Sequence, residues 1–280
     1  MALNRSCRKS KVKKDGEAAM ASSNHDASNR VVPEYDEHNL PPGRHMTAST
    51  NKRFVKREQT APGLPELLVG VAVFAALYAL VALLLPLIQD DAIAGVVGLV
   101  VSGLMGLIAV AVAVLIRKRG LSAFGFRRAT KRQLIVGVVL GIVAFLIGSV
   151  GTAVYTMISN DAQNVQTTYQ AGAAGGLLSI ALTFVAGSIL TPIGEEALFR
   201  GLIANVLIAR FGAWIGIIAS AAVFAVAHGI NPVMVVAFFV GILTALLFRW
   251  SHSIWPGVLL HGVNNAIALF LPVIIAAVTS

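Results

Sequence analysis

Long apolar runs alternate with short polar connections along most of this chain. Each run is close to the length of about 20 residues that a helix needs to cross the hydrocarbon core of a bilayer. A helix satisfies its own backbone polar groups there, so these runs predict membrane-spanning helices. The runs cover roughly residues 66–88, 93–116, 134–157, 174–192, 213–230, 232–249 and 254–278.

The stretch 195–211 is shorter and mixes charged with apolar residues. It is either an eighth, short span or a half-buried helix. Because proline suits the first turn of a helix, we expect a break at Pro192 and a new helix that opens with Glu195 and Glu196. The pattern therefore predicts an all-α fold, a polytopic transmembrane helix bundle of about seven to eight spans.

Composition and charge agree with an integral membrane protein. Of the 280 residues, 56% are hydrophobic and only 12% are charged, which is too apolar for a soluble domain. The net charge of +9 reflects basic residues before the first span and in the 117–133 loop, whereas the loops at 89–92 and 158–173 contain no Lys or Arg. This positive-inside pattern predicts a cytoplasmic N-terminus and contact with membrane lipid, without a nucleic-acid partner. The compact size and short loops fit a bacterial cytoplasmic membrane.

Three regions differ in character. Residues 1–62 are basic and lack apolar periodicity, so we expect a disordered cytoplasmic tail. Residues 63–173 form apolar scaffold helices, in which Gly137 and Gly141 stand four apart and permit close helix packing. Residues 174–278 carry embedded polar groups and are the predicted catalytic core.

The glutamate pair is the most informative feature of that core. A carboxylate at bilayer depth costs at least a few kcal/mol and is usually partnered and functional. In a helix, Glu196 and Arg200 are four apart and share a face, which predicts an ion pair suited to a water-poor setting. Glu195 points about 100° away and lacks such a partner, so it is a candidate general acid or base. Alternatively, both glutamates are structural, one paired with Arg200 and the other with the helix end.

Two histidines follow the glutamates. Phe224 and His228 stand four apart at the end of their run. A single His at such a place is as often an interfacial or hydrogen-bonded core residue as it is a functional one. His261 and Asn265 also stand four apart, and two donors aimed at one point suit an oxyanion. An interhelical hydrogen-bond pair is the alternative, and Asn264 is a neighbouring donor.

The depths of the two histidines pose a geometric difficulty. His228 ends its run, whereas His261 lies about eight residues inside its own, or about 12 Å along a helix axis. They share a depth only if the segments tilt, shorten or begin away from the membrane surface. If 195–211 is counted as a true span, the chain crosses the membrane eight times, and Glu195 and His228 both lie toward the cytoplasm.

Three short motifs occur in order on separate apolar segments, within roughly residues 174–275. They are Glu195-Glu196-ALF-Arg200, Phe224-AVA-His228 and His261-GVN-Asn265. This ordered set of EExxxR, FxxxH and HxxxN resembles the CPBP family, which comprises CAAX-protease (type II CAAX endopeptidase), bacteriocin-processing and Abi-like membrane peptidases.

The resemblance implies an intramembrane endopeptidase that acts on a membrane-associated peptide or protein substrate, lipidated ones included. It implies that Glu195 and His228 activate a water for attack on the scissile carbonyl, and that His261 and Asn265 steady the oxyanion. The residues implied to support the site are Glu196, Arg200 and Phe224.

No cofactor is favoured, although a divalent metal such as zinc is a possible alternative. Its ligands would be Glu195, His228 and His261. The HExxH arrangement that places both histidines on one helix is absent. Two other functions stay open: a proton-coupled transporter, since Glu and His also build proton relays, and a non-catalytic family member in bacteriocin immunity or protein sorting.

Overall fold

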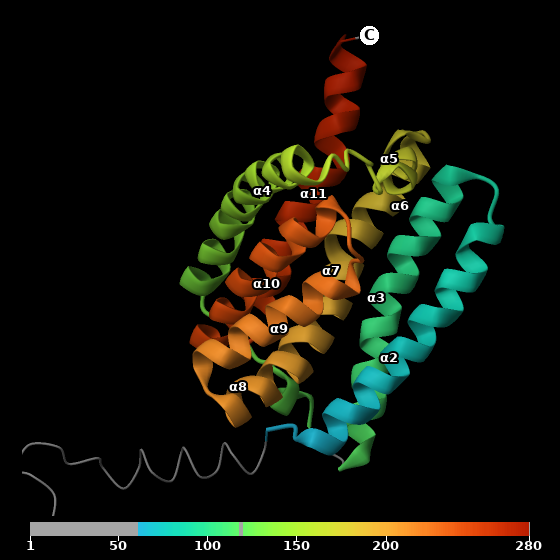
Figure 1. Cartoon of the computed structure of the whole chain (residues 1–280). Coiled ribbons are helices and arrows are strands. Elements are labelled where there is room, and N and C mark those ends of the chain that lie inside the picture. Colours follow the sequence, from blue (N-terminus) through green and yellow to red (C-terminus); the bar gives the residue numbers. More distant parts are fainter. Residues whose placement is uncertain (1–60, 118–119, 280) are drawn as a thin grey trace, which may run out of the picture. The chain divides into compact units, whose positions relative to one another are not determined.

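The structure, a computed structural model, describes residues 61–117 and 120–279, and this part of the chain consists of helices joined by short connections (Figure 1). The predicted disordered tail, residues 1–62, lies outside the described residues except for its last two positions. The longer elements in chain order are α2 (Leu64–Leu84), α3 (Asp91–Ile116), α4 (Lys131–Ser159), α5 (Thr167–Ala174), α6 (Leu177–Val185), α7 (Thr191–Glu196), α8 (Asn205–Phe211), α9 (Ala213–Ala227), α10 (Pro232–Ser251) and α11 (Trp255–Thr279). Between them lie two short 3-10 helices, η2 (Leu85–Leu87) and η3 (Leu121–Phe124), and two π-helical segments, η4 (Ala186–Leu190) and η5 (Ala197–Ala204).

Local capping residues set where the long helices begin. The Asp90 carboxylate accepts a hydrogen bond from the backbone N–H of Ile93 at 2.9 Å, which caps α3. Thr130 and Gln133 form a reciprocal capping box at the start of α4. Because each cap satisfies N–H groups that the first helical turn leaves unpaired, these starts are encoded locally.

Six helices within residues 61–117 and 120–279 are long and apolar enough to cross a membrane. They are Leu64–Leu87, Asp91–Ile116, Lys131–Ser159, Leu177–Phe211, Pro232–Ser251 and Trp255–Thr279. Five of them match predicted runs to within three residues at each end, so the prediction of an all-α integral membrane protein is confirmed. The predicted run 213–230 forms α9, which at 15 residues is shorter than a full crossing.

The predicted helix break at Pro192 is wrong. The segments from α6 to α8 continue as one helical run of 35 residues, Leu177–Phe211, so 195–211 is not a separate span. The N–H of Thr191 bonds to the carbonyl of Ala186, five residues back, and this widened π turn accommodates the proline ring within the run. Such a run is about 52 Å long at 1.5 Å per residue, and it passes obliquely through the bundle from α6 to α8 (Figure 1).

Glycines bring α3 and α7 into backbone contact. A Cβ atom on Gly106 would clash with the carbonyl of Gly194, and a Cβ on Gly194 would clash with the backbone of Gly103. Small residues permit this close approach between membrane helices. Because Gly194 directly precedes Glu195, the contact fixes how the glutamate pair faces α3.

The predicted close packing at Gly137 and Gly141 is confirmed, and it joins α4 to α11. Cβ atoms there would meet the carbonyls of Pro256 and Leu260. The buried core that surrounds these contacts includes Phe124, Leu198, Leu202, Phe224, Val240, Ile254 and Leu260.

We expect Gly106→Ala to destabilise the protein by about 1–3 kcal/mol, because the added methyl group overpacks the α3–α7 contact. The measurement is the Tm of detergent-purified protein. Gly120→Ala is the matched control, since the nearest described atom to its Cβ position is the Ser122 hydroxyl oxygen, at 3.8 Å. Equal Tm values for the two variants would contradict the role given to this contact.

Candidate functional site

The two glutamates lie next to each other on α7 and are both buried, with 7% of Glu195 and none of Glu196 exposed. Their side chains take different partners. One Nη of Arg200 lies 3.1 Å from Oε1 of Glu196, within the same helix, so the predicted ion pair is confirmed. The atoms form an ion pair without the angles of a hydrogen bond. Burial makes the pair interdependent, because either partner alone would be an uncompensated charge.

Aromatic and imidazole rings complete the surroundings of the ion pair. The Arg200 guanidinium lies over the ring of Phe224, 4.3 Å from its centroid, in a cation–π arrangement. Nδ1 of His261 lies 3.4 Å from Oε1 of Glu196. The pair therefore connects the 177–211 run to α9 and α11.

Glu195 faces away from this pair and toward α3. Its Oε1 accepts a hydrogen bond of 2.8 Å from the hydroxyl of Ser102. Its Oε2 lies 3.9 Å from Nε2 of His228 and 3.7 Å from Nε2 of His261, and it has no hydrogen-bond partner among the described residues. The structure thus brings Glu195 and both predicted histidines to one point.

Ser102 is a site residue that the sequence reasoning missed. It lies on α3, in the half of the chain that we expected to be scaffold alone. The only available signal was a single hydroxyl within the apolar run 93–116. The scaffold half therefore supplies a contact to the central carboxylate.

His228 caps the C-terminus of α9, and its ring orientation follows from one hydrogen bond. Nδ1 lies 2.8 Å from the carbonyl oxygen of Phe224. A carbonyl only accepts, so Nδ1 carries the proton and Nε2 of the neutral ring is left as an acceptor. Nε2 is the atom that faces Glu195. Phe224 also packs edge-on against both histidines, with ring centroids 4.6 Å from His228 and 5.6 Å from His261.

The depth difficulty posed by the two histidines is resolved by the shortness of α9. Because α9 ends after 15 residues, His228 reaches Glu195 at the level of His261, well inside α11. The segments shorten, which is one of the three solutions that the sequence allowed.

Asn265 makes the interhelical hydrogen bond that was the alternative to an oxyanion contact. Its amide donates to the carbonyl of Gly187 in η4 at 3.0 Å. That carbonyl needs a donor, because Thr191 already bonds to Ala186 and Pro192, five residues after Gly187, has no N–H. The neighbouring Asn264 donates to Asn265 at 3.3 Å, and its own carbonyl oxygen is buried and has no hydrogen-bond partner in the part of the chain that the structure describes.

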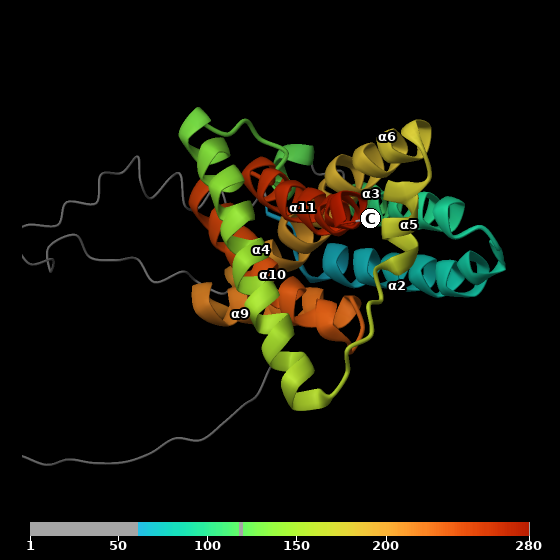
Figure 2. The ribbon, with the colours of Figure 1, turned by 90° about the horizontal axis from the view of Figure 1, so that it is seen from above.

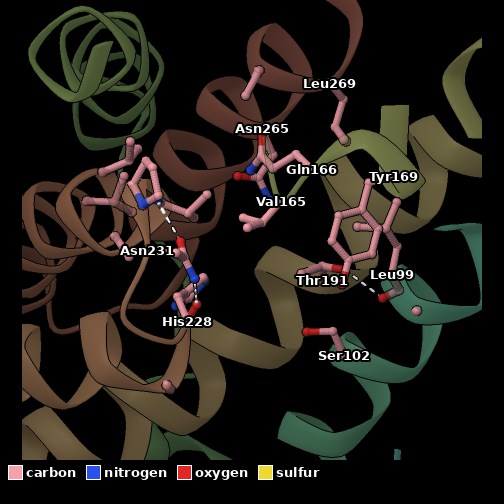
Figure 3. Close-up of a pocket in the computed structure, with 18 of the residues that line it drawn as sticks. Leu99, Ser102, Val165, Gln166, Tyr169, Thr191, His228, Asn231, Asn265 and Leu269 are labelled. Carbon is pink, nitrogen blue, oxygen red and sulfur yellow. Dashed lines mark hydrogen bonds between the residues drawn. The ribbon is translucent and has the colours of Figure 1, made fainter. Parts of the chain in front are cut away.

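One cavity of about 780 Å³ is lined by the side chains of Glu195, His228, His261, Asn264 and Asn265. His228 and Asn231 lie on one side of it, and Leu99, Ser102, Tyr169 and Thr191 on the other (Figure 3). Burial raises the pKa of the Tyr169 phenol on α5, and the charge of Glu195 adds to the effect. The phenol is thus neutral at ordinary pH and faces the same space as the carboxylate.

Glu195 and His228 face each other without a direct hydrogen bond, and Oε2 of Glu195 is buried. Oε2 of the glutamate and Nε2 of the neutral imidazole are both acceptors, so they cannot hydrogen-bond to each other at 3.9 Å. A water that entered between them would donate one hydrogen to each, once a small movement of the side chains exposed Oε2. One carboxylate and two imidazoles also form a donor set that zinc takes; among residues 61–117 and 120–279, however, no three His, Cys, Asp or Glu side chains are arranged to hold a metal ion.

The fold and the site define an integral membrane protein with a buried Glu–His cluster at a cavity. Residues 177–267 match the family model of the type II CAAX prenyl endopeptidases, Rce1-like, so the chain carries a domain of this family. The resemblance found in the three motifs is thereby confirmed, and all three lie in the matched segment. No curated protein and no solved structure matches the chain.

We expect Arg200→Gln to destabilise the protein by about 3–5 kcal/mol, because it leaves the Glu196 charge buried without its partner. Adding Glu196→Gln should restore much of the loss, since two neutral side chains then replace the pair. The Tm of purified protein measures both effects. Arg249→Gln is the control, as Arg249 is exposed. A double variant no more stable than Arg200→Gln would contradict this interpretation of the pair.

Proposed function

We propose that this protein is an intramembrane endopeptidase in which Glu195 and His228 activate a water for attack on a peptide carbonyl. The observation that carries the proposal is the pair of facing acceptors, Oε2 of Glu195 and Nε2 of His228, at the wall of a cavity in a domain of a peptidase family. Glu195 takes one proton of the water as general base, while His228 orients the water through its second hydrogen, and Glu195 then gives its proton to the leaving amine as the C–N bond breaks.

The other motif residues have supporting roles in this proposal. With a proton on each ring nitrogen, His261 would donate toward the reacting centre, and the amide of Asn265 would complete an oxyanion site. The Glu196–Arg200 pair and Phe224 hold these groups in place. The proposed mechanism needs no metal.

The substrate in this proposal is a membrane-associated peptide or protein, including lipidated ones. The cavity wall supplied by α2 includes Phe74 and Val81, and η2 adds Leu85, which suits an apolar chain beside the polar centre. The proposed location is a bacterial cytoplasmic membrane with a cytoplasmic N-terminus, in keeping with the basic 117–133 loop.

Glu195→Gln should reduce peptide cleavage by at least about 10²–10⁴-fold, since it removes the base but keeps the shape of the side chain. The assay compares membrane-derived peptides from cells with the wild-type protein and with the variant, at equal amounts of folded protein. Asp91→Asn is the control, because Asp91 is an exposed carboxylate at a helix start. We also expect cleavage to survive metal chelation.

Three outcomes would replace this proposal. Unchanged cleavage or phenotype in folded Glu195→Gln protein would favour the non-catalytic role. Proton or ion flux in vesicles that depends on Glu195 would favour a transporter. A stoichiometric bound metal that is lost in His228→Ala would favour metal-dependent hydrolysis.

Asn265→Ala should lower kcat by about 10²–10³-fold if its amide stabilises the oxyanion. The same change also removes the bond to Gly187, so Tm is measured alongside kcat. A lower Tm with unchanged kcat per folded molecule would assign Asn265 a structural role only.

A further inference from the structure

Outside the buried core with Glu195, Glu196 and Arg200, the charged residues of the described chain lie at the two ends of the helix bundle, and the acidic Glu66 lies at the same end as its partner Arg117. Apart from Arg200, which is paired in the core, the described Lys and Arg residues lie at helix ends and in the η3 connection. They are Arg117, Arg127, Arg128, Lys131, Arg132, Arg210 and Arg249. We call this the basic end.

Contacts between distant segments show that these positions belong to one end. The N–H of Ile254, shortly after α10, bonds to the carbonyl of Gly125 beside η3 at 3.0 Å. The amide of Asn205 at the start of α8 donates to the carbonyl of Ala123 at 2.9 Å. In Figure 1, η3 and α8 lie at the bottom of the bundle.

The opposite end carries acidic and uncharged polar residues, and we call it the acidic end. Asp90 and Asp91 begin α3, and Asp161 follows α4. The start of α3 packs on α5, because a Cβ on Gly95 would clash with the backbone of Thr168. The α2–α3 and α4–α5 connections accordingly lie at the top of Figure 1.

The cavity reaches the surface at the acidic end. Its lining includes exposed residues of the α4–α5 connection, residues 162–165, together with exposed Pro86 after α2 and Pro272 in α11. Seen from above, this connection runs from the end of α4 to α5 across the face of the bundle (Figure 2).

On the other side, the cavity is closed toward the basic end. The Glu196–Arg200 pair, Leu202 and Phe124 lie between the site and that end, and at most 1% of each is exposed. Water and substrate can therefore approach Glu195 from the acidic end, or from between α2 and α4 in the membrane, since both helices line the cavity.

The mouth of the cavity is lined with amide side chains. Gln163, Asn164, Gln166 and Gln170 line it, with Asn164 donating to Gln170 at 2.9 Å and Gln170 donating to the carbonyl of Ala268 at 3.4 Å. An amide side chain offers both a donor and an acceptor, as a peptide backbone does. These residues suit an extended, neutral peptide segment.

Basic residues of membrane proteins accumulate on the cytoplasmic side. From this rule and the direction of the cavity, we infer that the site opens to the extracytoplasmic side and takes a peptide segment of a membrane-anchored protein that has already been exported. This reverses the orientation of Glu195 and His228 toward the cytoplasm that the sequence suggested. The substrate part of the inference rests on the proposed peptidase function; the orientation does not.

Single-cysteine labelling in intact bacterial cells tests the orientation. Cys7 is the only cysteine, so a Cys7→Ser chain is the background. Gln163→Cys at the cavity mouth should react with a membrane-impermeant maleimide in intact cells, and Ser122→Cys at the basic end only after permeabilisation. Both positions are exposed, and neither change alters the charge. The reverse labelling pattern would overturn the inference.

A second pair of variants on α4 tests whether the cavity is continuous with that side. Both Ser149 and Leu146, less than one turn apart, are exposed, but Ser149 lines the cavity whereas Leu146 lies outside it within the apolar span. A small impermeant thiol reagent should modify Ser149→Cys in intact cells and leave Leu146→Cys unmodified. Reaction of Ser149→Cys only in permeabilised cells would show that the cavity opens to the cytoplasm.

Cleavage sites test the substrate class. Peptides lost in Glu195→Gln cells should map to extracytoplasmic segments close to a membrane anchor, and sites in cytoplasmic segments would refute this class. If wild-type and Glu195→Gln cells yield the same peptides while Gln163→Cys is labelled from outside, the peptidase proposal fails and the orientation stands. If Gln163→Cys is protected in intact cells, the orientation fails whatever the peptides show.

Discussion

The ion pair between Glu196 and Arg200 is the interaction on which the rest of the site depends. Both charges are buried, so neither is stable there without the other. The pair also organises its neighbours, because Phe224 lies under the guanidinium and His261 lies against the carboxylate. Arg200 is engaged by Glu196, and Glu195 forms no ion pair with an Arg or Lys of the described residues. It is directed instead at Ser102 and the two histidines.

A second constraint comes from the irregular backbone of the 177–211 run. Non-helical or distorted backbone at membrane depth is tolerated where it is buried in protein or lines a cavity. Here the π turn η4 accommodates Pro192, and the amide of Asn265 satisfies the carbonyl that the proline leaves without a donor. The same asparagine lines the cavity. One side chain thus meets a structural requirement of the long helix and also lines the cavity.

The two ends of the helix bundle differ in charge and in packing. One end gathers basic residues and is closed by a packed core, whereas the other carries aspartates and amides and admits solvent to the cavity. Because of this asymmetry, the charge of each end goes together with its packing and with access to the cavity. The charges orient a membrane protein during insertion, and the position of the packed core then decides from which side the central carboxylate is reached.

The sequence by itself determined the apolar spans, the helix starts at Asp90 and Thr130, the Glu196–Arg200 pair and the motifs that mark the family. Each depends on hydropathy, capping or helical spacing, which act between residues close in the chain. It did not determine the contact of Ser102 with Glu195, the continuity of the helix through Pro192 or the meeting of His228 with His261. Those depend on close backbone approach and on where α9 ends relative to other helices, and contacts between residues far apart in the chain arise only when the helices pack.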